Sequence, residues 1–530
     1  MPRETPAVID TPVPWWQTCV AYQIYPRSYC DTTGNGVGDL DGIRRHLDHL
    51  VDLGVDAIWL SPFFRSPMAD YGYDVADYCD VDPLFGDLAG FDSLLSDAHS
   101  RGLRVIIDWV PNHTSIEHPW FVESASSRDN PKRDWYVWRD PAPDGGPPNN
   151  WIESLTFGPA WTLDERTGQY YLHCFLSEQP DLNWGHPDVV AAMHDTLRFW
   201  LDRGVDGFRM DVVHLIGKDP ELPDEPADYV GLPHTVLNDR PETHELLRDI
   251  RTLVDSYDGD RMAIGEIYLL DTDIVASYFG EGDELHLCFN FPPLYTPWQA
   301  ERWRDAIRRT VASHGPRHAW PTWVLSNHDN PRHRTRYGAD DPTSEATGAD
   351  ELIARAAALL LLNLRGTPFL YAGEELGLTD AVVTEEQRHD PAGRDGCRAP
   401  IPWTPEPDHG WAAGATPWLP WPPHAEVRNV ATERDDPSSM LAWYRRLLAL
   451  RRAHPALQIG SLDLIEIDAG EVLTFERSHD SATYVVALNM SGRPQPAPSG
   501  DAILISSTDG TDRSTLAPWE ARITLEEPTR

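Results

Sequence analysis

Short apolar runs alternate along most of the chain with amphipathic stretches of helical period. Apolar runs between turn residues predict strands, and apolar positions three and four apart predict helices. The predicted strands are Val20–Tyr25, Ala57–Leu60, Val105–Val110, Val205–Asp211, Met262–Ile267, Leu285–Phe291, Thr322–Ser326 and Phe369–Tyr371. The predicted helices are Leu40–Leu53, Phe91–Ser100, Val189–Arg203, Leu352–Leu364 and Met440–Arg452. Eight strands separated by helical segments indicate an α/β fold, a (β/α)8 TIM barrel.

Two long insertions and a tail depart from this rhythm. Residues 111–183 follow the third predicted strand, are rich in Pro, Gly, Asn and Trp, and lack a helical period, which predicts an insertion domain. Residues 374–434 form a second insertion after the eighth strand. Alternating runs such as VLTFERS and ATYVVALNM predict a C-terminal antiparallel β-sandwich. We therefore expect a barrel over 1–110 and 184–456, an insertion domain over 111–183 and a β domain over 457–530.

Composition and charge narrow the range of partners. The 530 residues include 44 Lys and Arg against 84 Asp and Glu, a formal net charge of −40. This charge repels a phosphate backbone, so we exclude nucleic acid as a partner. No segment predicts a membrane span or a secretory signal. Six scattered cysteines without metal-type spacing favour reduced thiols and a cytoplasmic location, and nothing indicates the oligomeric state.

Charged side chains gather where the predicted strands end. The strand C-termini of a barrel meet at one face, where barrel enzymes build their sites. Residues two apart in a strand point to the same side, so Arg209 and Asp211 should face one cavity or form a buried ion pair. Carboxylates that converge from three strands repel one another unless the chemistry uses them. The strand ends contain Asp108 and His113 (third), Arg209 and Asp211 (fourth), Glu266 (fifth), and His328 and Asp329 (seventh).

Three carboxylates suit the cleavage of a glycosidic bond. One must be ionised to attack the sugar carbon, one must be protonated to donate to the leaving oxygen, and a third can hold sugar hydroxyls. Asp211 fits the nucleophile because the guanidinium of Arg209 favours the ionised carboxylate. Glu266 has no cation in its motif and fits the acid, and Asp329 fits the third role. Retention of configuration requires the first two carboxyl groups to lie about 5–5.5 Å apart.

The motifs at these strand ends resemble those of a known family. DWVPNH, GFRMDVVH, GEIY and SNHD resemble, in order and separation, the four signature regions of the α-amylase superfamily, glycoside hydrolase family 13. QPDLNW, MADYGYDVADY and GRDGCRAPIPW resemble its α-glucosidase and oligo-1,6-glucosidase branch. The resemblance covers nearly the whole chain. It implies Asp211 as nucleophile, Glu266 as general acid/base and Asp329 as transition-state stabiliser.

The resemblance also implies which residues bind the glucose that precedes the scissile bond. Tyr73 would supply a stacking face, and Asp70 with Arg398 would fix the remote hydroxyls. Two aromatic residues, Phe157 and Phe175, would either wall the pocket or pack into the core. The complete implied set is Asp70, Tyr73, His113, Phe157, Phe175, Arg209, His328 and Arg398.

The segment DTTGNGVGD resembles a loop for a hard cation, because oxygen-bearing side chains alternate with glycines. Related glucosidases have a similar loop for calcium or magnesium. The resemblance implies the side chains of Asp31, Thr33, Asn35 and Asp39 and the carbonyl of Val37 as ligands. A metal-free turn is the alternative, because Thr33 and Asn35 leave the ligand charge low. The chemistry itself requires no cofactor, so any Ca²⁺ or Mg²⁺ here would be structural.

We expect a retaining, exo-acting α-glucosidase that acts on short malto- or isomalto-oligosaccharides or other glucosides. The long insertions should close the pocket to one glucose unit. Val212, which follows the expected nucleophile, resembles the α-1,6-active members. One alternative is a glucosyl-transferring relative such as a trehalose synthase or sucrose isomerase, because the motifs do not show whether water or a sugar accepts the glucosyl group. Another is a non-catalytic barrel subunit that partners a transporter.

Overall fold

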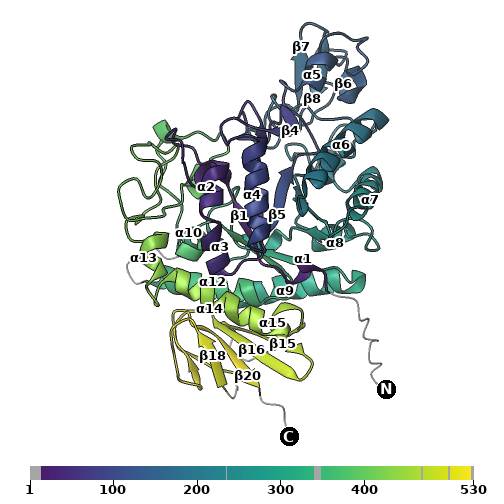
Figure 1. Cartoon of the computed structure of the whole chain (residues 1–530). Helices are drawn as coiled ribbons and strands as arrows, with labels where there is room; N and C mark the ends of the chain where they lie inside the picture. The colour runs from purple at the N-terminus through teal and green to yellow at the C-terminus, as the bar shows by residue number, and fades with distance from the viewer. Residues whose placement is uncertain (1–12, 234, 340–347, 467–469, 499–501, 527–530) are drawn as a thin grey trace, which may run out of the picture.

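Eight parallel strands form the centre of the molecule (Figure 1). The computed structural model describes residues 13–526 except 234, 340–347, 467–469 and 499–501. The strands follow the order β11-β10-β9-β5-β2-β1-β13-β12, so neighbours in the chain are mostly neighbours in the sheet. They are β1 (Ala21–Ile24), β2 (Ala57–Leu60), β5 (Arg104–Trp109), β9 (Gly207–Met210), β10 (Met262–Gly265), β11 (Leu287–Cys288), β12 (Thr322–Val324) and β13 (Thr367–Tyr371).

A side chain links the two outer strands of this sheet. The hydroxyl of Thr322 in β12 donates to the carbonyl of Cys288 in β11 (2.8 Å) and accepts from the backbone N–H of Asn290 (3.2 Å). The sheet therefore curls back on itself, and the predicted barrel fold is confirmed. The sixth strand is shorter than the predicted Leu285–Phe291, because its backbone leaves the ladder after Cys288.

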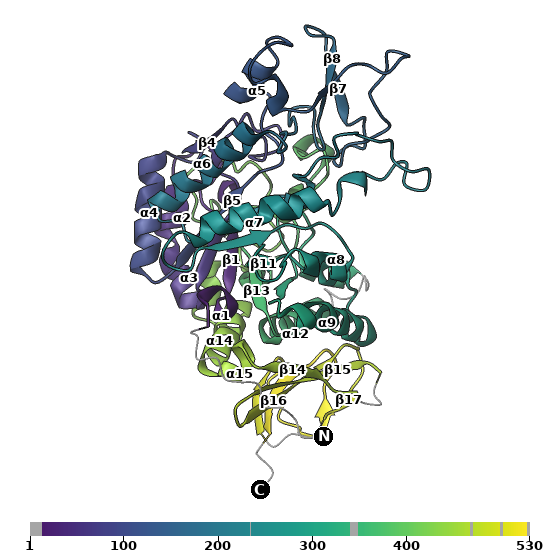
Figure 2. The ribbon, with the colours of Figure 1, turned by 90° about the vertical axis from the view of Figure 1, so that its right-hand side faces the viewer.

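Helices surround the strands, as Figures 1 and 2 show. The predicted single helix Leu40–Leu53 is wrong, because the chain breaks at His46 into α2 (Leu40–Arg45) and α3 (Leu47–Leu53). The His46 ring stacks on Trp403 with centroids 3.5 Å apart. The longer helices are α4 (Leu88–Ser100), α6 (Pro187–Arg203), α7 (Pro241–Asp255), α9 (Ala300–His314), α12 (Ala349–Asn363) and α14 (Met440–Ala453).

The insertion after β5 stands above the strand ends, at the top of Figure 1. It contains a short helix, α5 (Pro119–Ser124), although its sequence shows no helical period. It also contains an antiparallel sheet in the order β6-β8-β7. These strands are β6 (Trp138–Arg139), β7 (Trp161–Asp164) and β8 (Gln169–Leu172).

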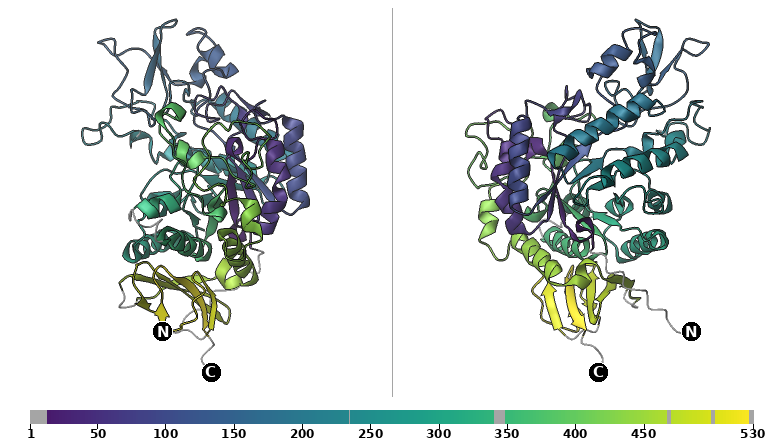
Figure 3. Two further views of the ribbon diagram at one scale, coloured as in Figure 1. Left: turned by 90° about the vertical axis from the view of Figure 1, so that its left-hand side faces the viewer. Right: turned by 45° about the vertical axis from the view of Figure 1, so that its right-hand side comes forward.

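The C-terminal region is antiparallel, as predicted, and lies at the opposite end of the molecule from the insertion in every view (Figures 1–3). The buried guanidinium of Arg477 donates to the carbonyl of Asn363 at the end of α12, which ties this sheet to the barrel. The exact domain boundaries stay a prediction. The main sheet contains β14 (Ser461–Leu464), β15 (Val472–His479), β16 (Ala482–Asn489), β20 (Ala521–Glu526) and β18 (Ala502–Ser506), and a second contains β17 (Gln495–Pro496) and β19 (Thr515–Leu516).

The sequence predicts reduced thiols and no membrane span. All six cysteines are unpaired, and five of them are buried. Within the part of the chain that the structure describes, no helix combines the length and the apolar character that a membrane crossing needs.

Candidate active site

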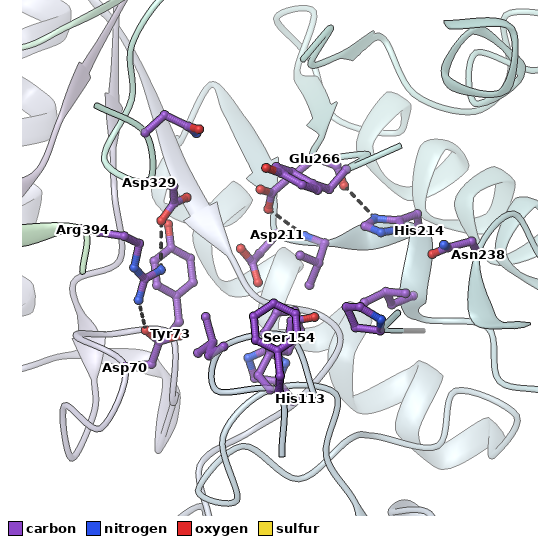
Figure 4. A pocket seen from close by; sticks show the side chains of 18 residues that line it. Asp70, Tyr73, His113, Ser154, Asp211, His214, Asn238, Glu266, Asp329 and Arg394 are labelled. Carbon is purple, nitrogen blue, oxygen red and sulfur yellow. Dashed lines mark hydrogen bonds and ion pairs between the residues drawn. The ribbon is translucent and has the colours of Figure 1, made fainter. Parts of the chain in front are cut away.

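A cavity of about 520 Å³ lies at the C-terminal ends of the barrel strands (Figure 4). This volume is within the range of small-molecule sites. The structure brings eight of the eleven expected catalytic and substrate-binding residues to its wall, and places Arg209, His328 and Arg398 behind the wall. Those on the wall are Asp70, Tyr73, His113, Phe157, Phe175, Asp211, Glu266 and Asp329.

The end of β9 positions the first carboxylate. Arg209 is the third residue of the strand, and Asp211 follows its last residue. The two side chains point to the same side, with Arg209 Nη1 2.7 Å from Asp211 Oδ1. Arg209 is buried below the cavity floor, whereas Asp211 reaches the cavity. The alternation of strand residues therefore places a buried cation and the carboxylate that it contacts on the same side of the strand.

A single guanidinium contacts three carboxylates. Besides Asp211, Arg209 lies 2.8 Å from Oδ1 of Asp108 on β5 and 2.6 Å from Oε2 of Glu266 after β10. Asp108 and Arg209 are paired in the β5–β9 ladder, which sets this contact. Glu266 therefore has a cationic partner that its own motif does not reveal. One positive charge opposes three carboxyl groups, which favours retention of a proton among them.

Burial raises the pKa of Asp211 well above its ordinary range. Arg209 lowers that pKa, and the adjacent Glu266 and Asp108 raise it again. Burial also raises the pKa of Asp108 to about 7. The expectation that Arg209 alone keeps Asp211 ionised is therefore too simple. Carboxyl groups this close titrate together, and a shared proton leaves one as nucleophile and the other as acid.

Asp329 has the opposite electrostatic environment. Burial raises its pKa, but His328, Arg394 and Arg398 lower it by more, so the pKa lies below its usual range. Arg394 Nη1 is 2.9 Å and Arg398 Nη2 is 3.2 Å from Asp329 Oδ1. Asp329 is thus an ionised carboxylate on the cavity wall, able to accept hydrogen bonds from sugar hydroxyls.

His328 supports this wall from behind. The amide of Gln23 donates to its Nδ1 (2.7 Å), so Nε2 carries the proton and donates to the hydroxyl of Tyr73 (2.5 Å). Burial lowers the pKa of His328 to about 3, which keeps the ring neutral near pH 7. The neutral ring orients Tyr73, which lies on the cavity wall.

The expected partnership of Asp70 with Arg398 needs a correction. Arg394 Nη2 lies 2.8 Å from Asp70 Oδ1, and Arg394 lines the cavity. Arg398 is completely buried, and its side chain bonds the carbonyl of His328 (2.8 Å) and Asp329. Both arginines belong to one motif, four positions apart, and the turn Asp395–Arg398 determines which of them faces the cavity. Sequence patterns do not reveal that choice.

His113 and the two phenylalanines also lie on the wall. The amide of Gln179 lies 3.1 Å from His113 Nε2 and 3.2 Å from Asp70 Oδ2, so it links these two residues. The Phe175 ring is 5.1 Å from the His113 ring. Phe157 is 62% exposed at the rim, which excludes the core-packing alternative for this residue.

Two further residues of the wall, His214 and Asn238, were not expected from the sequence, and Val212 makes a contact that the sequence did not predict. The backbone N–H of Val212 donates to Glu266 Oε2 (3.1 Å), and Val212 has a left-handed backbone (φ 35°) that β-branched residues rarely adopt. His214 and Asn238 line the cavity on the side of Asp211 away from Arg394 (Figure 4). They lie in an irregular segment after β9, whose path a pattern of apolar residues does not predict.

The loop Asp31–Asp39 is held by its own hydrogen bonds. The backbone N–H groups of Thr33, Gly34 and Gly36 donate to the Asp31 carboxylate, and the Val37 N–H donates to the side-chain oxygen of Asn35. Asp39 caps α2 through the Gly42 N–H (2.7 Å) and accepts from Thr32. Backbone donors thus contact the side-chain oxygens of three of the five implied ligands, Asp31, Asn35 and Asp39. Among the described residues, no three His, Cys, Asp or Glu side chains are arranged to hold a metal. A structural cation stays a prediction.

Comparisons with known proteins agree with the fold and the motifs. A family model described as the α-amylase catalytic domain matches residues 23–460. A probable α-glucosidase of Rhizobium meliloti (strain 1021) is 44% identical over 93% of this chain and 92% of its own length. An oligo-1,6-glucosidase of Parageobacillus thermoglucosidasius is 37% identical over 96% of this chain and 98% of its own.

Solved structures give the same result at the level of the whole fold. An α-glucosyl transfer enzyme superimposes with a TM-score of 0.90 at 43% identity, over 97% of this chain and all of its own. A trehalulose synthase variant superimposes with a TM-score of 0.90 at 34% identity, over 97% and 100%. The chain therefore belongs to the α-amylase family and is an α-glucosidase-like enzyme of glycoside hydrolase family 13.

Proposed function

We propose that this enzyme hydrolyses terminal α-linked glucose from short oligosaccharides with retention of configuration. The observation that carries the proposal is the convergence of Asp211, Glu266 and Asp329 on one cavity, with the Asp70–Arg394 pair beside them. A cavity of about 520 Å³ suits a small glucoside better than a polymer. The presence of all three carboxylates on one cavity wall argues against the non-catalytic alternative, which would have lost them.

The mechanism gives each carboxyl group one role, with the proton shared in this cluster residing on Glu266 when substrate binds. In the first half, ionised Asp211 attacks the anomeric carbon while Glu266 protonates the departing oxygen, which leaves a glucosyl ester on Asp211. In the second half, Glu266 takes a proton from water, the water oxygen attacks the same carbon, and Asp211 departs. Two inversions retain the configuration. Asp329, held ionised by Arg394 and Arg398, accepts bonds from sugar hydroxyls and stabilises positive charge on the ring.

Arg209 and Val212 would keep Glu266 in place during both halves. Both donate to Oε2, so Oε1 is left to exchange the proton with the leaving group and with water. Asp70 and Arg394, linked to Gln179, form a polar end that suits the remote hydroxyls of one glucose unit. Such an end favours exo action. Val212 lines the cavity next to Asp211, so its side chain is placed to select the linkage, and we propose a preference for α-1,6.

Proton NMR of fresh reaction mixtures tests the proposal directly. With p-nitrophenyl α-glucoside as substrate, whose leaving group is not a sugar, α-glucose should appear first and β-glucose only later by mutarotation. Early β-glucose would rule out the double displacement. The turnover of isomaltose and of maltose is compared in a separate assay. A turnover ratio that favours maltose would overturn the α-1,6 preference but leave the mechanism intact.

Glucosyl transfer is the second candidate, because solved structures with TM-scores of 0.90 include a glucosyl transfer enzyme and a trehalulose synthase. The two reactions share the glucosyl ester and differ only in the acceptor. Chromatography of products from maltose and sucrose separates them. Hydrolysis releases two glucose molecules per maltose, or one glucose and one fructose per sucrose, whereas transfer places the glucosyl unit in a new glucoside.

A further inference from the structure

A buried arginine lies behind the polar end of the cavity. Arg27 is in the short turn Pro26–Ser28 that follows β1, and it is only 7% exposed. Its Cζ atom lies 5.2 Å from the centroid of the Tyr71 ring, 5.1 Å from that of Trp418 and 5.8 Å from that of Phe85. We call Arg27 and these three rings the Arg27 cage.

The cation in this cage has no anionic partner. Among the described residues, Arg27 forms no ion pair, and its buried Nε has no hydrogen-bond partner. Burial lowers the pKa of Arg27, but an arginine stays charged in a protein. A desolvated guanidinium is attracted to the faces of aromatic rings, most strongly to that of tryptophan. The cage therefore stabilises this cation in the way that a carboxylate stabilises Arg394.

On one side, the cage holds the turn that carries Asp70 and Tyr73. Both of these residues line the cavity, whereas the ring of Tyr71, between them in the chain, lies over Arg27. The backbone is left-handed at Tyr71 (φ 50°) and at Gly72 (φ 113°). A tyrosine keeps this conformation only where its surroundings fix it. The contact of Tyr71 with Arg27 therefore helps to keep Asp70 and Tyr73 on the cavity wall.

On the other side, the cage holds the segment that carries Arg394. Trp418 belongs to the second insertion, and its ring lies against Arg27 and 5.8 Å from the ring of His389. His389 precedes Asp390, whose Oδ1 lies 2.6 Å from Arg394 Nη2. One cation is thus packed between the two segments whose ion pair closes the polar end of the cavity (Figure 4).

We propose that Arg27 is a positioning residue for the glucose unit: its cage sets the placement of Asp70 against Arg394, and so the grip on hydroxyls remote from the anomeric carbon. This inference rests on the proposed function, in which Asp70 and Arg394 bind the sugar. Arg27 acts on them through Tyr71 and Trp418. Without the cation, the two rings close on the space that it leaves, and the segments that carry them shift. A shift of about 1 Å in a binding group is large enough to lower the rate.

Recognition of a single remote hydroxyl tests this role. The wild-type enzyme and Arg27→Met are supplied with p-nitrophenyl α-glucoside and with its 4-deoxy analogue, which lacks a hydroxyl at the end of the ring away from the reacting carbon. The ratio of the two kcat/KM values measures how well that hydroxyl is held. The wild type should favour the glucoside about 100-fold or more, and Arg27→Met should lower this ratio about tenfold. Methionine leaves no acid unpaired, because Arg27 has none.

Arg365→Met is the matched control. Arg365 also lies over a tryptophan, with its Cζ 4.5 Å from the Trp320 ring, and burial lowers its pKa too. It precedes β13 and so lies at the end of the barrel away from the cavity. The control should keep the wild-type ratio, since it loses a similar contact without touching the segments of the ion pair.

The outcomes separate a positioning role from a purely structural one. An unchanged ratio in Arg27→Met, even with lower kcat/KM for both substrates, would overturn the inference. An equal fall of the ratio in the control would overturn it too, as would a wild type that hydrolyses both substrates equally well. Absence of nitrophenol release from the glucoside by the wild type would instead overturn the proposed function.

Two further variants keep the test decisive if Arg27→Met does not fold. Arg27→Lys retains the charge but not the planar group that stacks on the rings, so it should lower the ratio by less, about threefold. Tyr71→Leu removes the ring next to Asp70 and leaves the cation against Trp418, and it should lower the ratio about tenfold. Wild-type ratios in both of these variants would overturn the inference.

Discussion

Strand β9 has an aspartate just beyond each end. Both aspartates are buried, but they differ in the number of their cationic partners and in the direction of their pKa shifts. Asp206 precedes the strand, and Asp211 follows it. Both oxygens of Asp206 are engaged, since Arg104 (2.8 Å) and Arg261 (3.2 Å) contact Oδ1 while His99 (2.7 Å) contacts Oδ2. Burial raises its pKa, but His99, Arg104 and the N–H of Val105 lower it by more, so the pKa lies below its usual value.

Asp211 shares one guanidinium with two other carboxyl groups and has a raised pKa. Hydrogen bonds stabilise the charged form of Asp206. The charged form of Asp211 is less stabilised, as its raised pKa shows, and is therefore more reactive. In a barrel the face where strands begin serves stability and the face where they end serves catalysis. The partners of the two aspartates therefore match the structural role of Asp206 and the catalytic role proposed for Asp211.

The largest expected effects come from the same substitution at both ends of the strand. Asp211→Asn should lower kcat about 10⁴-fold or more, because no ester can form, and should leave the unfolding free energy unchanged or higher. Asp206→Asn should lower the unfolding free energy by about 2 kcal/mol, because its charged donors lose their partner, and should keep kcat within about twofold of wild type. Urea denaturation and steady-state kinetics measure the two quantities. Exchanged outcomes, with Asp206 needed for turnover and Asp211 for stability, would break the comparison.

The next effect concerns Arg394, the arginine of the GRDGCRAPIPW motif that lines the cavity. Arg394→Met should lower kcat/KM for isomaltose about 100-fold, because Asp70 and Asp329 lose the cation that orients them against the sugar. Arg388→Met, on the same segment but outside the cavity wall, is the control and should change kcat/KM by less than about twofold. Similar losses in both variants would attribute the effect to the segment and not to the site.

A smaller effect concerns the pH profile. The charge of Asp108 raises the pKa of Asp211, which must be ionised to attack. Asp108→Asn removes that repulsion, so the acid limb of kcat/KM should move to lower pH. Initial rates between pH 4 and 8 measure it, roughly the range in which carboxyl groups with raised pKa values titrate. A limb that moves to higher pH would show that Asp108 acts on Arg209 more than on Asp211.

The smallest effect is expected at the loop Asp31–Asp39. Because backbone donors satisfy Asp31 and Asp39, removal of divalent cations with EDTA should leave the melting temperature unchanged, and added Ca²⁺ or Mg²⁺ should not raise it. Calorimetric scans with and without chelator measure this. A cation-dependent rise in melting temperature would establish the structural metal that the motif implies.

Much of the barrel follows from the sequence, because short apolar runs and helical periods depend on neighbours along the chain. The pairing of Arg209 with Asp211 is also predictable from the local sequence, because residues that are two positions apart in a strand point to the same side. The contact of Arg209 with Glu266 depends on the register between β9 and β10, which local patterns do not encode. The choice between Arg394 and Arg398, and the break of the first helix at His46, likewise depend on distant residues such as Asp70 and Trp403.

The central claim is that Asp211 forms a covalent bond to glucose, and trapping that ester tests it most directly. Wild-type enzyme, together with Glu266→Gln to slow release, is incubated with p-nitrophenyl α-glucoside, quenched in acid, digested and examined by mass spectrometry. We predict one added glucosyl unit on the peptide that contains Asp211 and none in Asp211→Asn. A glucosyl unit on another peptide, or turnover by the enzyme with no adduct on any peptide, would contradict the account.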